Sequence, residues 1–310
     1  MLLKKPPQVA PSPPQLPQHP ILISGGGIAG LVLASTLFKL KIPYIILEKK
    51  SKSTVDDGAD LAFWPSSIKI LKELGIDQKL WENSLPISQV HLAKSSTDIL
   101  NTVNMDRVTL GTGEHFRLVA RHDLMTCLQH LQENSQNILY NCKITKIEEM
   151  SDCVRVIYSE NGLEKSIVGH VLVGADGVNS VSRHFITASS ALPRYTGEIC
   201  FRGTTSSPHL ANLAEAPNTM TIWYGNGYRA SWGLISPTKS YWWVKVKAKD
   251  ENLAKELISG LPAPINEFAA NSSYVHPIID RMSSDRWCSS RCVLVGDAAH
   301  PVTPNMAQGM

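Results

Sequence analysis

A glycine-rich turn near the N-terminus restricts the fold of this chain more than any other sequence feature. The segment Gly25-Gly26-Gly27-Ile28-Ala29-Gly30 follows the apolar run Ile21–Ser24. Gly25 permits a tight turn, Gly27 lets the backbone approach a pyrophosphate, and Gly30 lets a helix pack closely on a strand. The sequence therefore predicts a strand over 21–24, a helix from 28 to about 40 and a parallel strand over 43–47, which together form a βαβ unit.

The end of the second predicted strand adds an acidic residue to this unit. Glu48 stands where a carboxylate accepts hydrogen bonds from ribose hydroxyls. A pyrophosphate would lie at the positive end of the helix that starts at Ile28 and Ala29. This signature alone leaves two questions open, because a glycine-rich turn can be purely structural and because NAD and FAD both use it.

Two later signatures favour FAD. Gly174-Ala175-Asp176-Gly177 follows the predicted strand 171–173, and Gly296-Asp297-Ala298-Ala299-His300-Pro301 follows the predicted strand 292–295. Gly296 leaves room for a ligand, and Asp297 can accept hydrogen bonds from a polyol such as the ribityl chain. An Asp after a strand can also be a helix cap. Only a long dinucleotide, contacted at several points, requires all three signatures.

The rest of the chain predicts two structural units. Helices are expected over 65–74, about 122–133 and 252–261, strands with loose loops over 87–119, and a β-meander over 144–168. Strands rich in aromatic residues over 195–248 favour an antiparallel sheet. We predict an α/β, Rossmann-like FAD-binding domain with an inserted antiparallel β-sheet substrate domain. The expected bounds are a disordered Pro-rich leader (1–20), the first part of the FAD domain (21–190), the insertion (191–285) and the return segment (286–310).

Composition excludes several classes of partner. The chain is 43% hydrophobic and 18% charged, with a formal net charge of +3, which does not favour nucleic acid or an anionic membrane. The uncharged run 21–38 approaches the length of a membrane span, but its central glycines favour a strand, turn and helix. Six cysteines without zinc-type spacing predict free thiols. We therefore expect a soluble, cytoplasmic protein with no transmembrane segment and no metal; its oligomeric state is not predicted.

The set of motifs, from Ile21 to Met310, resembles the single-component flavoprotein aromatic hydroxylases. This is the family of para-hydroxybenzoate and salicylate hydroxylases, with zeaxanthin epoxidase as a relative. The resemblance implies an FAD-dependent monooxygenase with NAD(P)H as co-substrate. In the family, a flavin hydroperoxide formed with molecular oxygen transfers one oxygen atom to an aromatic ring or an alkene, and for this chain a small, aromatic substrate is expected.

The resemblance also assigns cofactor contacts. Arg121 matches the flavin-contacting arginine, Asp176 and Gly177 match a motif near the FAD and NAD(P)H pyrophosphates, and Pro301 matches a proline near the flavin ring. The segment of Gly309 leads, in relatives, into a helix whose N-terminus points at the flavin. The predicted cofactor-binding set is Gly25, Gly27, Ile28, Ala29, Gly30, Glu48, Arg121, Asp176, Gly177, Gly296, Asp297, Pro301 and Gly309.

Three side chains are the candidate catalytic residues. Arg202, in Glu198–Gly203, resembles the arginine at the flavin–substrate boundary and suits a planar anion, although it could be a surface cation. His300 could act as an acid or base or could only pack at the flavin, and Tyr224 is a candidate polar contact. The predicted strands also hold aromatic residues that could line a substrate pocket or belong to the core: Trp223, Tyr224, Trp232, Trp242 and Trp243.

Other functions remain open at this stage. The chain ends where relatives continue, so a non-catalytic or weakly active flavin-binding remnant is one alternative. A different flavoenzyme of the same fold, an epoxidase or a halogenase, is another, although the stretch Ser231–Pro237 lacks the WxWxIP pattern of halogenases. A plain NAD dehydrogenase would not need the Asp297 signature.

Overall fold

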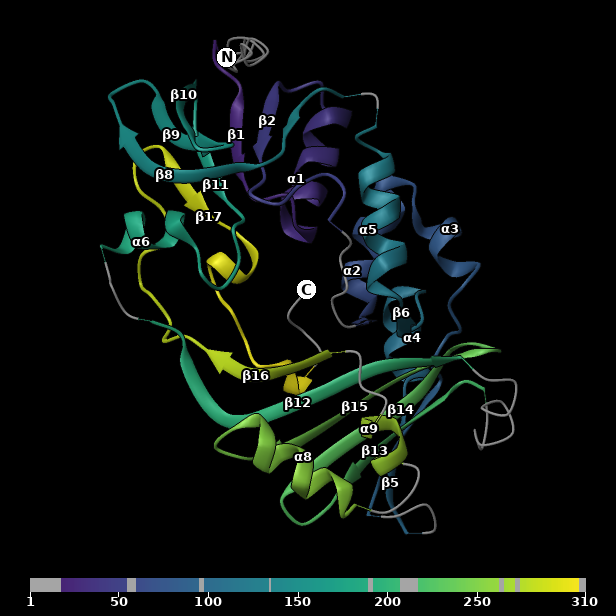
Figure 1. The fold of residues 1–310 in the computed structure, drawn as a ribbon. Coiled ribbons are helices and arrows are strands. Elements are labelled where there is room, and N and C mark those ends of the chain that lie inside the picture. The colour runs from purple at the N-terminus through teal and green to yellow at the C-terminus, as the bar shows by residue number, and fades with distance from the viewer. Residues whose placement is uncertain are drawn as a thin grey trace, which may run out of the picture.

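The structure, a computed structural model, describes residues 18–54, 60–94, 98–133, 135–188, 192–206, 217–261, 265–270 and 274–306. Strands in these ranges form a five-stranded, a seven-stranded, a three-stranded and a two-stranded sheet. Figure 1 shows the five-stranded sheet and its helices in one half of the molecule and the seven-stranded sheet in the other. The α/β class with a β-rich second part is confirmed. The predicted leader, 1–20, lies almost wholly outside the described residues.

The five-stranded sheet is the framework of the predicted nucleotide domain. Its order is β17-β11-β1-β2-β7, and every neighbouring pair is parallel. The strands are β1 (Ile21–Ser24), β2 (Tyr44–Leu47), β7 (Ile138–Leu139), β11 (Leu172–Gly174) and β17 (Cys292–Leu294). Helix α1 (Ile28–Lys39) connects β1 to β2, which confirms the predicted βαβ unit.

Both faces of this sheet are buried, as is usual for parallel strands. Successive residues of β1 point to opposite faces, and Leu22 and Ile23 are both 0% exposed. Ile23 packs in a core with α1 and α5 (Arg121–His130), whereas Leu22 packs against the predicted β-meander. That meander is the three-stranded sheet of β8 (Cys142–Glu149), β9 (Val154–Glu160) and β10 (Leu163–Gly169).

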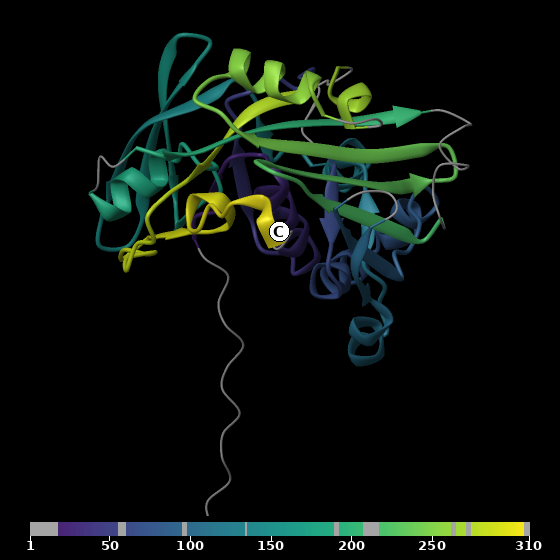
Figure 2. The same cartoon turned by 90° about the horizontal axis from the view of Figure 1, so that it is seen from below.

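The seven-stranded sheet has the order β16-β12-β15-β14-β13-β4-β5. Its strands are β4 (Gln89–Ala93), β5 (Ile99–Asn104), β12 (Arg194–Ser206), β13 (Thr219–Tyr224), β14 (Tyr228–Ser236), β15 (Lys239–Lys247) and β16 (Tyr274–Asp280). Figure 2 shows α8 (Glu251–Ser259) and α9 (Ile265–Ala270) over one face of this sheet. The pairings are antiparallel except for β13 with β4, which is parallel.

The parallel pair joins two of the predicted domains in one sheet. Strands β4 and β5 belong to the predicted first part of the FAD domain (21–190), and β4 pairs with β13 of the predicted insertion. The pairing joins segments far apart in the sequence, so no local pattern indicates it. The boundaries 191–285 and 286–310 remain predictions.

The remaining elements are mostly shorter. They are β3 (Leu61–Phe63), α2 (Pro65–Leu74), α3 (Asp77–Trp81), α4 (Asp106–Thr112), β6 (Arg117–Val119), α6 (Val181–Thr187), η1 (Gly296–Ala298) and η2 (Pro304–Met306). Helix α2 ends at Gly75 with φ 77°, as its glycine predicts. Helix α4 differs from the expected strands and loops over 87–119. It has no buried residue, so it lacks the apolar stripe by which a helix is recognised.

The cysteines and the helix lengths are two further properties of this structure. All six cysteines are free thiols. Among the helices in the described ranges, none has both the length and the apolar character needed to cross a membrane.

Candidate functional site

The three glycine signatures lie at one edge of the parallel sheet. The first follows β1, Glu48 follows β2, the second begins at the last residue of β11, and the third follows β17. Because all these strands are parallel, their carboxyl ends meet at the same edge, which is where open α/β sheets bind ligands. Segments more than 100 residues apart are thus collected at a single place, as Figure 1 shows for β1, β11 and β17.

The first two signatures are in direct contact. Gly25 has φ 101°, and a Cβ atom there would lie 2.6 Å from the carbonyl oxygen of Ala175. Both the backbone conformation and the space therefore require glycine. The N–H of Ala175 donates to the carbonyl of Ser24 at 2.8 Å, which locks the two turns together.

The glycines that open α1 have two different roles. A Cβ atom on Gly30 would lie 2.0 Å from the carbonyl oxygen of Gly25, so Gly30 lets the helix pack on the turn. A Cβ atom on Gly27 would meet nothing within 4 Å, so open space lies in front of the helix. No side chain caps α1 at Gly27, and the first N–H groups of a helix have no intrahelical partner. This terminus can receive an anion.

Glu48 is held by the glycine turn itself. Its Oε2 accepts a hydrogen bond from the N–H of Gly26 at 2.6 Å, and its Oε1 accepts one from the N–H of Lys50 at 2.7 Å. Each carboxylate oxygen can accept more than one hydrogen bond, so capacity remains for ligand hydroxyls. The carboxylate is thus oriented before any ligand binds.

A cavity of about 330 Å³ lies in front of these groups. It brings together many of the residues predicted from the sequence to contact the cofactor. They are Gly25, Gly27, Glu48, Arg121, Asp176 and Gly177. The residues Gly296, Asp297 and Pro301 do not line this cavity.

Asp176 lines the cavity, but its carboxylate is used within the protein. Ser180 Oγ donates to Oδ1, while the N–H and Oγ of Ser182 donate to Oδ2 at 3.0 and 3.1 Å. These contacts tie the second signature to the start of α6. The side chain therefore shapes the turn, and the backbone of Ala175–Gly177 is the part that can approach a ligand.

The third signature reaches the same region from β17. A Cβ atom on Gly296 would lie 2.9 Å from the Cβ of Ala29 in α1, so the third turn touches the first. Burial raises the pKa of Asp297, while the charges of His300 and Arg121 act in the opposite direction. The positive charge of Arg121 therefore acts on the Asp297 carboxylate.

Arg183 is a residue that the sequence analysis missed. It is only 7% exposed, and its guanidinium donates to the carbonyls of Ala298 (3.1 Å), Ala299 (2.6 Å) and Met282 (3.0 Å). It holds the third signature in place from α6. The available signal was an arginine among small and apolar residues seven positions after Asp176, in Val181-Ser182-Arg183.

The seven-stranded sheet presents two different faces. Side chains alternate along each strand, and one face forms a core with α8 and α9 that contains Trp223, Trp232 and Trp242. These three tryptophans therefore do not line a pocket facing the nucleotide part. Trp243 and Tyr241 point the other way and pack with Trp64, which follows β3, and Phe116, which precedes β6.

Arg202 lies on the face that is turned to the nucleotide part, in register with Trp243 of β15 and Tyr274 of β16. Its Nε donates to Cys200 Sγ at 3.2 Å. Burial, and then the charge of Arg202, lowers the pKa of His276 to about 4. Burial also raises the pKa of the Tyr241 phenol. The surroundings of the guanidinium thus include a thiol, phenols and a neutral imidazole.

The other candidate catalytic residues lie apart from Arg202. Tyr224 is 41% exposed at the end of β13, and β15 and β14 separate it from β12, so roughly 14 Å divides the two backbones. His300 lies with the third signature, where its ring is 5.4 Å from that of Trp287. Pro301 is half-buried next to it. Gly309 lies outside the described residues.

Comparisons with known proteins agree with this geometry. A family model described as "FAD binding domain" matches residues 18–310. The FAD-dependent monooxygenase adrH of Penicillium rubens is 25% identical, and the match covers 93% of this chain and 64% of adrH. The 3-amino-4-hydroxybenzoate 2-monooxygenase PtmB3 of Streptomyces platensis is 27% identical, with 93% and 75% covered.

A solved structure shows the same fold. Klebsiella pneumoniae HpxO, complexed with FAD and uric acid, superposes with a TM-score of 0.81 at 22% identity, over 94% of this chain and 76% of HpxO. The match thus spans 64% to 76% of the length of these three proteins. Because the family model spans every residue that the structure describes, the protein belongs to the FAD binding domain family.

Proposed function

We propose that this protein is an FAD-dependent monooxygenase that uses NAD(P)H and molecular oxygen to oxidise a small aromatic or heterocyclic compound. One observation carries the proposal: three glycine signatures, far apart in the sequence, meet at the carboxyl edge of one parallel sheet. A mononucleotide needs only the first of them. The names of adrH and PtmB3 as monooxygenases support the reaction class.

The residues present suit FAD. The open space at Gly27, in front of an uncapped helix terminus, fits a pyrophosphate, and Glu48 is oriented toward the same cavity for ribose hydroxyls. Asp297 and Arg121, whose charges act on each other, fit the ribityl and flavin portions. FAD when bound supplies the hydride acceptance and the oxygen activation that no protein side chain provides. The protein binds, orients and excludes water.

Arg202 is the residue we assign to the substrate. It projects from the sheet face turned to the nucleotide part, and a guanidinium pairs well with a planar carboxylate or phenolate. The named substrate of PtmB3 is a benzoate, and the HpxO structure contains uric acid. We therefore propose a planar substrate with an acidic group, bound between Arg202 and the flavin. The insertion 191–285, together with β4 and β5, would form the substrate part.

The test follows the oxygen atom. The purified chain should show an oxidised flavin spectrum that NADPH or NADH bleaches faster when a suitable benzoate or hydroxylated heterocycle is present. Under ¹⁸O₂, the product should gain one labelled oxygen atom, and catalase should return little oxygen. Hydrogen peroxide as the sole oxygen product across the whole panel, or product labelled only from water, would refute the proposal.

A matched variant separates the substrate assignment from the reaction class. Arg202→Lys retains the positive charge but not the bidentate fork, and Arg202→Met removes both. Both variants should keep wild-type FAD content and raise KM for acidic substrates, Arg202→Met by roughly tenfold or more. An unchanged KM in Arg202→Met would remove Arg202 from the substrate site.

A further inference from the structure

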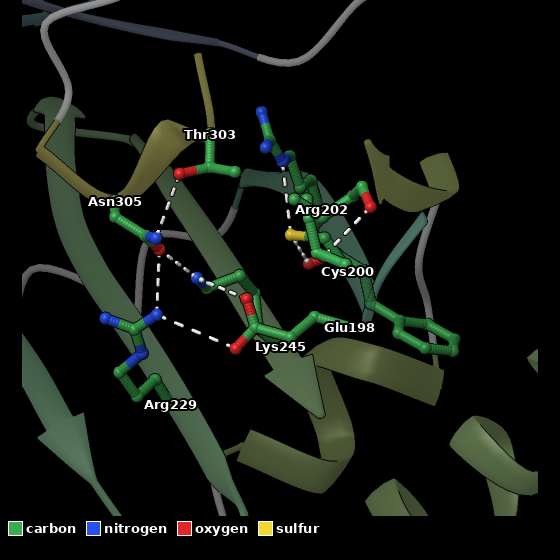
Figure 3. A network of polar contacts seen from close by, with 10 residues as sticks. Glu198, Cys200, Arg202, Arg229, Lys245, Thr303 and Asn305 are labelled. Carbon is green, nitrogen blue, oxygen red and sulfur yellow. Dashed lines mark hydrogen bonds and ion pairs between the residues drawn. The ribbon is translucent and has the colours of Figure 1, made fainter. Parts of the chain in front are cut away.

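A polar network connects the large sheet to the segment after the third signature. Glu198 of β12, Lys245 of β15 and Arg229 of β14 lie on three adjacent strands. Lys245 Nζ lies 3.3 Å from Glu198 Oε2 and also donates to Asn305 Oδ1 of η2. Arg229 Nη2 donates to the same Asn305 oxygen at 2.7 Å (Figure 3).

The charged side chains of this network carry a net positive charge. Lys245 and Arg229 are two cations, and Glu198 is the single carboxylate that the network contains. The Lys245 side chain is only 3% exposed, and burial lowers its pKa. A buried ammonium is stable only when acceptors surround it. The amide oxygen of Asn305 supplies the further acceptor, so these cations favour the state in which η2 is docked.

The docked segment follows the predicted flavin site directly. Asn305 comes eight residues after Asp297 and four after Pro301. Its amide nitrogen, Nδ2, donates to Thr303 Oγ1 at 3.0 Å, so both the oxygen and the nitrogen of the amide are hydrogen-bonded. The backbone from 298 to 306 therefore has fixed attachments at both ends: Arg183 at Ala298 and Ala299, and the network at Asn305.

We propose that Glu198, Lys245 and Arg229 are positioning residues, a clamp that binds Asn305 and thereby fixes the 300–306 segment between the flavin site and the large sheet. Two cations on β14 and β15 recognise one amide oxygen, and Glu198 keeps Lys245 charged in its buried position. The clamp consists of this chain's own residues and does not depend on which reaction the protein catalyses. Its consequence for turnover, a site closed to water in which the electrons of NAD(P)H end in oxygenated product and not in hydrogen peroxide, rests on the proposed function.

The experiment measures hydrogen–deuterium exchange of the amides between Ala298 and Met306 in the full chain, together with the dissociation constant of FAD from its fluorescence. Lys245→Met removes the cation and keeps the length of the side chain. Lys247→Met is the matched control, because Lys247 lies two residues along the same strand, points to the same side of the sheet and is exposed. Lys245→Met should accelerate exchange roughly tenfold and weaken FAD binding, while Lys247→Met should change neither.

Two substitutions of the exposed residue Asn305 should change the exchange rate in opposite directions. Asn305→Leu removes the shared acceptor and should accelerate exchange as Lys245→Met does. Asn305→Asp places a carboxylate between the two cations and should slow exchange below that of the wild type. Equal exchange in Asn305→Leu and Asn305→Asp, or Lys245→Met matching Lys247→Met, would overturn the clamp.

Activity then separates the clamp from the proposed function. If the chain is a monooxygenase, Asn305→Leu should lower the ratio of product formed to NAD(P)H oxidised while the KM for NAD(P)H changes little. Changed exchange with no monooxygenase activity in any variant would support the clamp and refute the proposed function. Unchanged exchange in an active enzyme would refute the clamp alone.

Discussion

The substitution Gly27→Ala tests the cofactor geometry most sharply, because the structure separates its effects on folding and on binding. In the free protein the added methyl group would meet no atom within 4 Å. Gly27 has φ −77° and ψ −174°, which alanine adopts readily. The remaining cost is the preference of a helix N-cap for glycine over alanine, so unfolding should become easier by less than about 1 kcal/mol.

Binding should respond much more strongly. The methyl group would occupy the open space at the start of α1, where we place the pyrophosphate. Displacing the phosphates weakens one or two charge-assisted hydrogen bonds, each contributing about 1.5–3 kcal/mol. Since about 1.4 kcal/mol corresponds to a tenfold change, the dissociation constant for FAD should rise by about 10- to 100-fold or more.

Gly75→Ala is the matched control. Its Cβ also meets nothing within 4 Å, but Gly75 ends α2 with φ 77°, where an L side chain is strained by about 1–2 kcal/mol. We expect this variant to lose stability in urea and to bind FAD like the wild type. Apoprotein titrated with FAD, and urea unfolding of each apoprotein, measure both quantities. Gly27→Ala with wild-type affinity, or with a larger loss of stability than Gly75→Ala, would refute the reasoning.

Three further substitutions test other parts of the site. Asp297→Ala should lower FAD retention by roughly tenfold with little loss of stability; wild-type flavin content would contradict its assignment. Arg183→Met removes three charged hydrogen bonds to backbone carbonyls and should lower the free energy of unfolding by about 3 kcal/mol or more, and urea curves that superpose with those of the wild type would count against this role. The pKa of His276 is 6.5 in the unfolded chain and about 4 in the folded protein. Between these pH values the unfolded state therefore binds more protons than the folded state, and the free energy of unfolding of the wild type should decline as pH is lowered from about 6.5 toward 4. His276→Phe should decline less over that range, and equal slopes of stability against pH would exclude His276 as a source.

Short-range features of the fold were predictable from the sequence. The positions of β1, α1, β2 and α2 follow from steric rules for glycine and from apolar periodicity, which act over a few residues. The three signatures could be recognised because each follows a strand and carries its own glycine. Parallel strands align their carboxyl ends, so the βαβ pattern implied that the three signatures would meet at one edge of the sheet.

Only the tertiary structure decided what depends on distant partners. Alternation along β13–β15 shows that two faces exist, but not that α8 and α9 cover the one with Trp232 and Trp242. The pairing of β4 with β13 and the docking of Asn305 on Lys245 likewise join segments with no local relation. The physical reason lies in the range of the interactions. Strand pairing and side-chain burial stabilise contacts between segments that can lie far apart in the sequence, whereas glycine sterics and helix periodicity act on neighbouring residues alone.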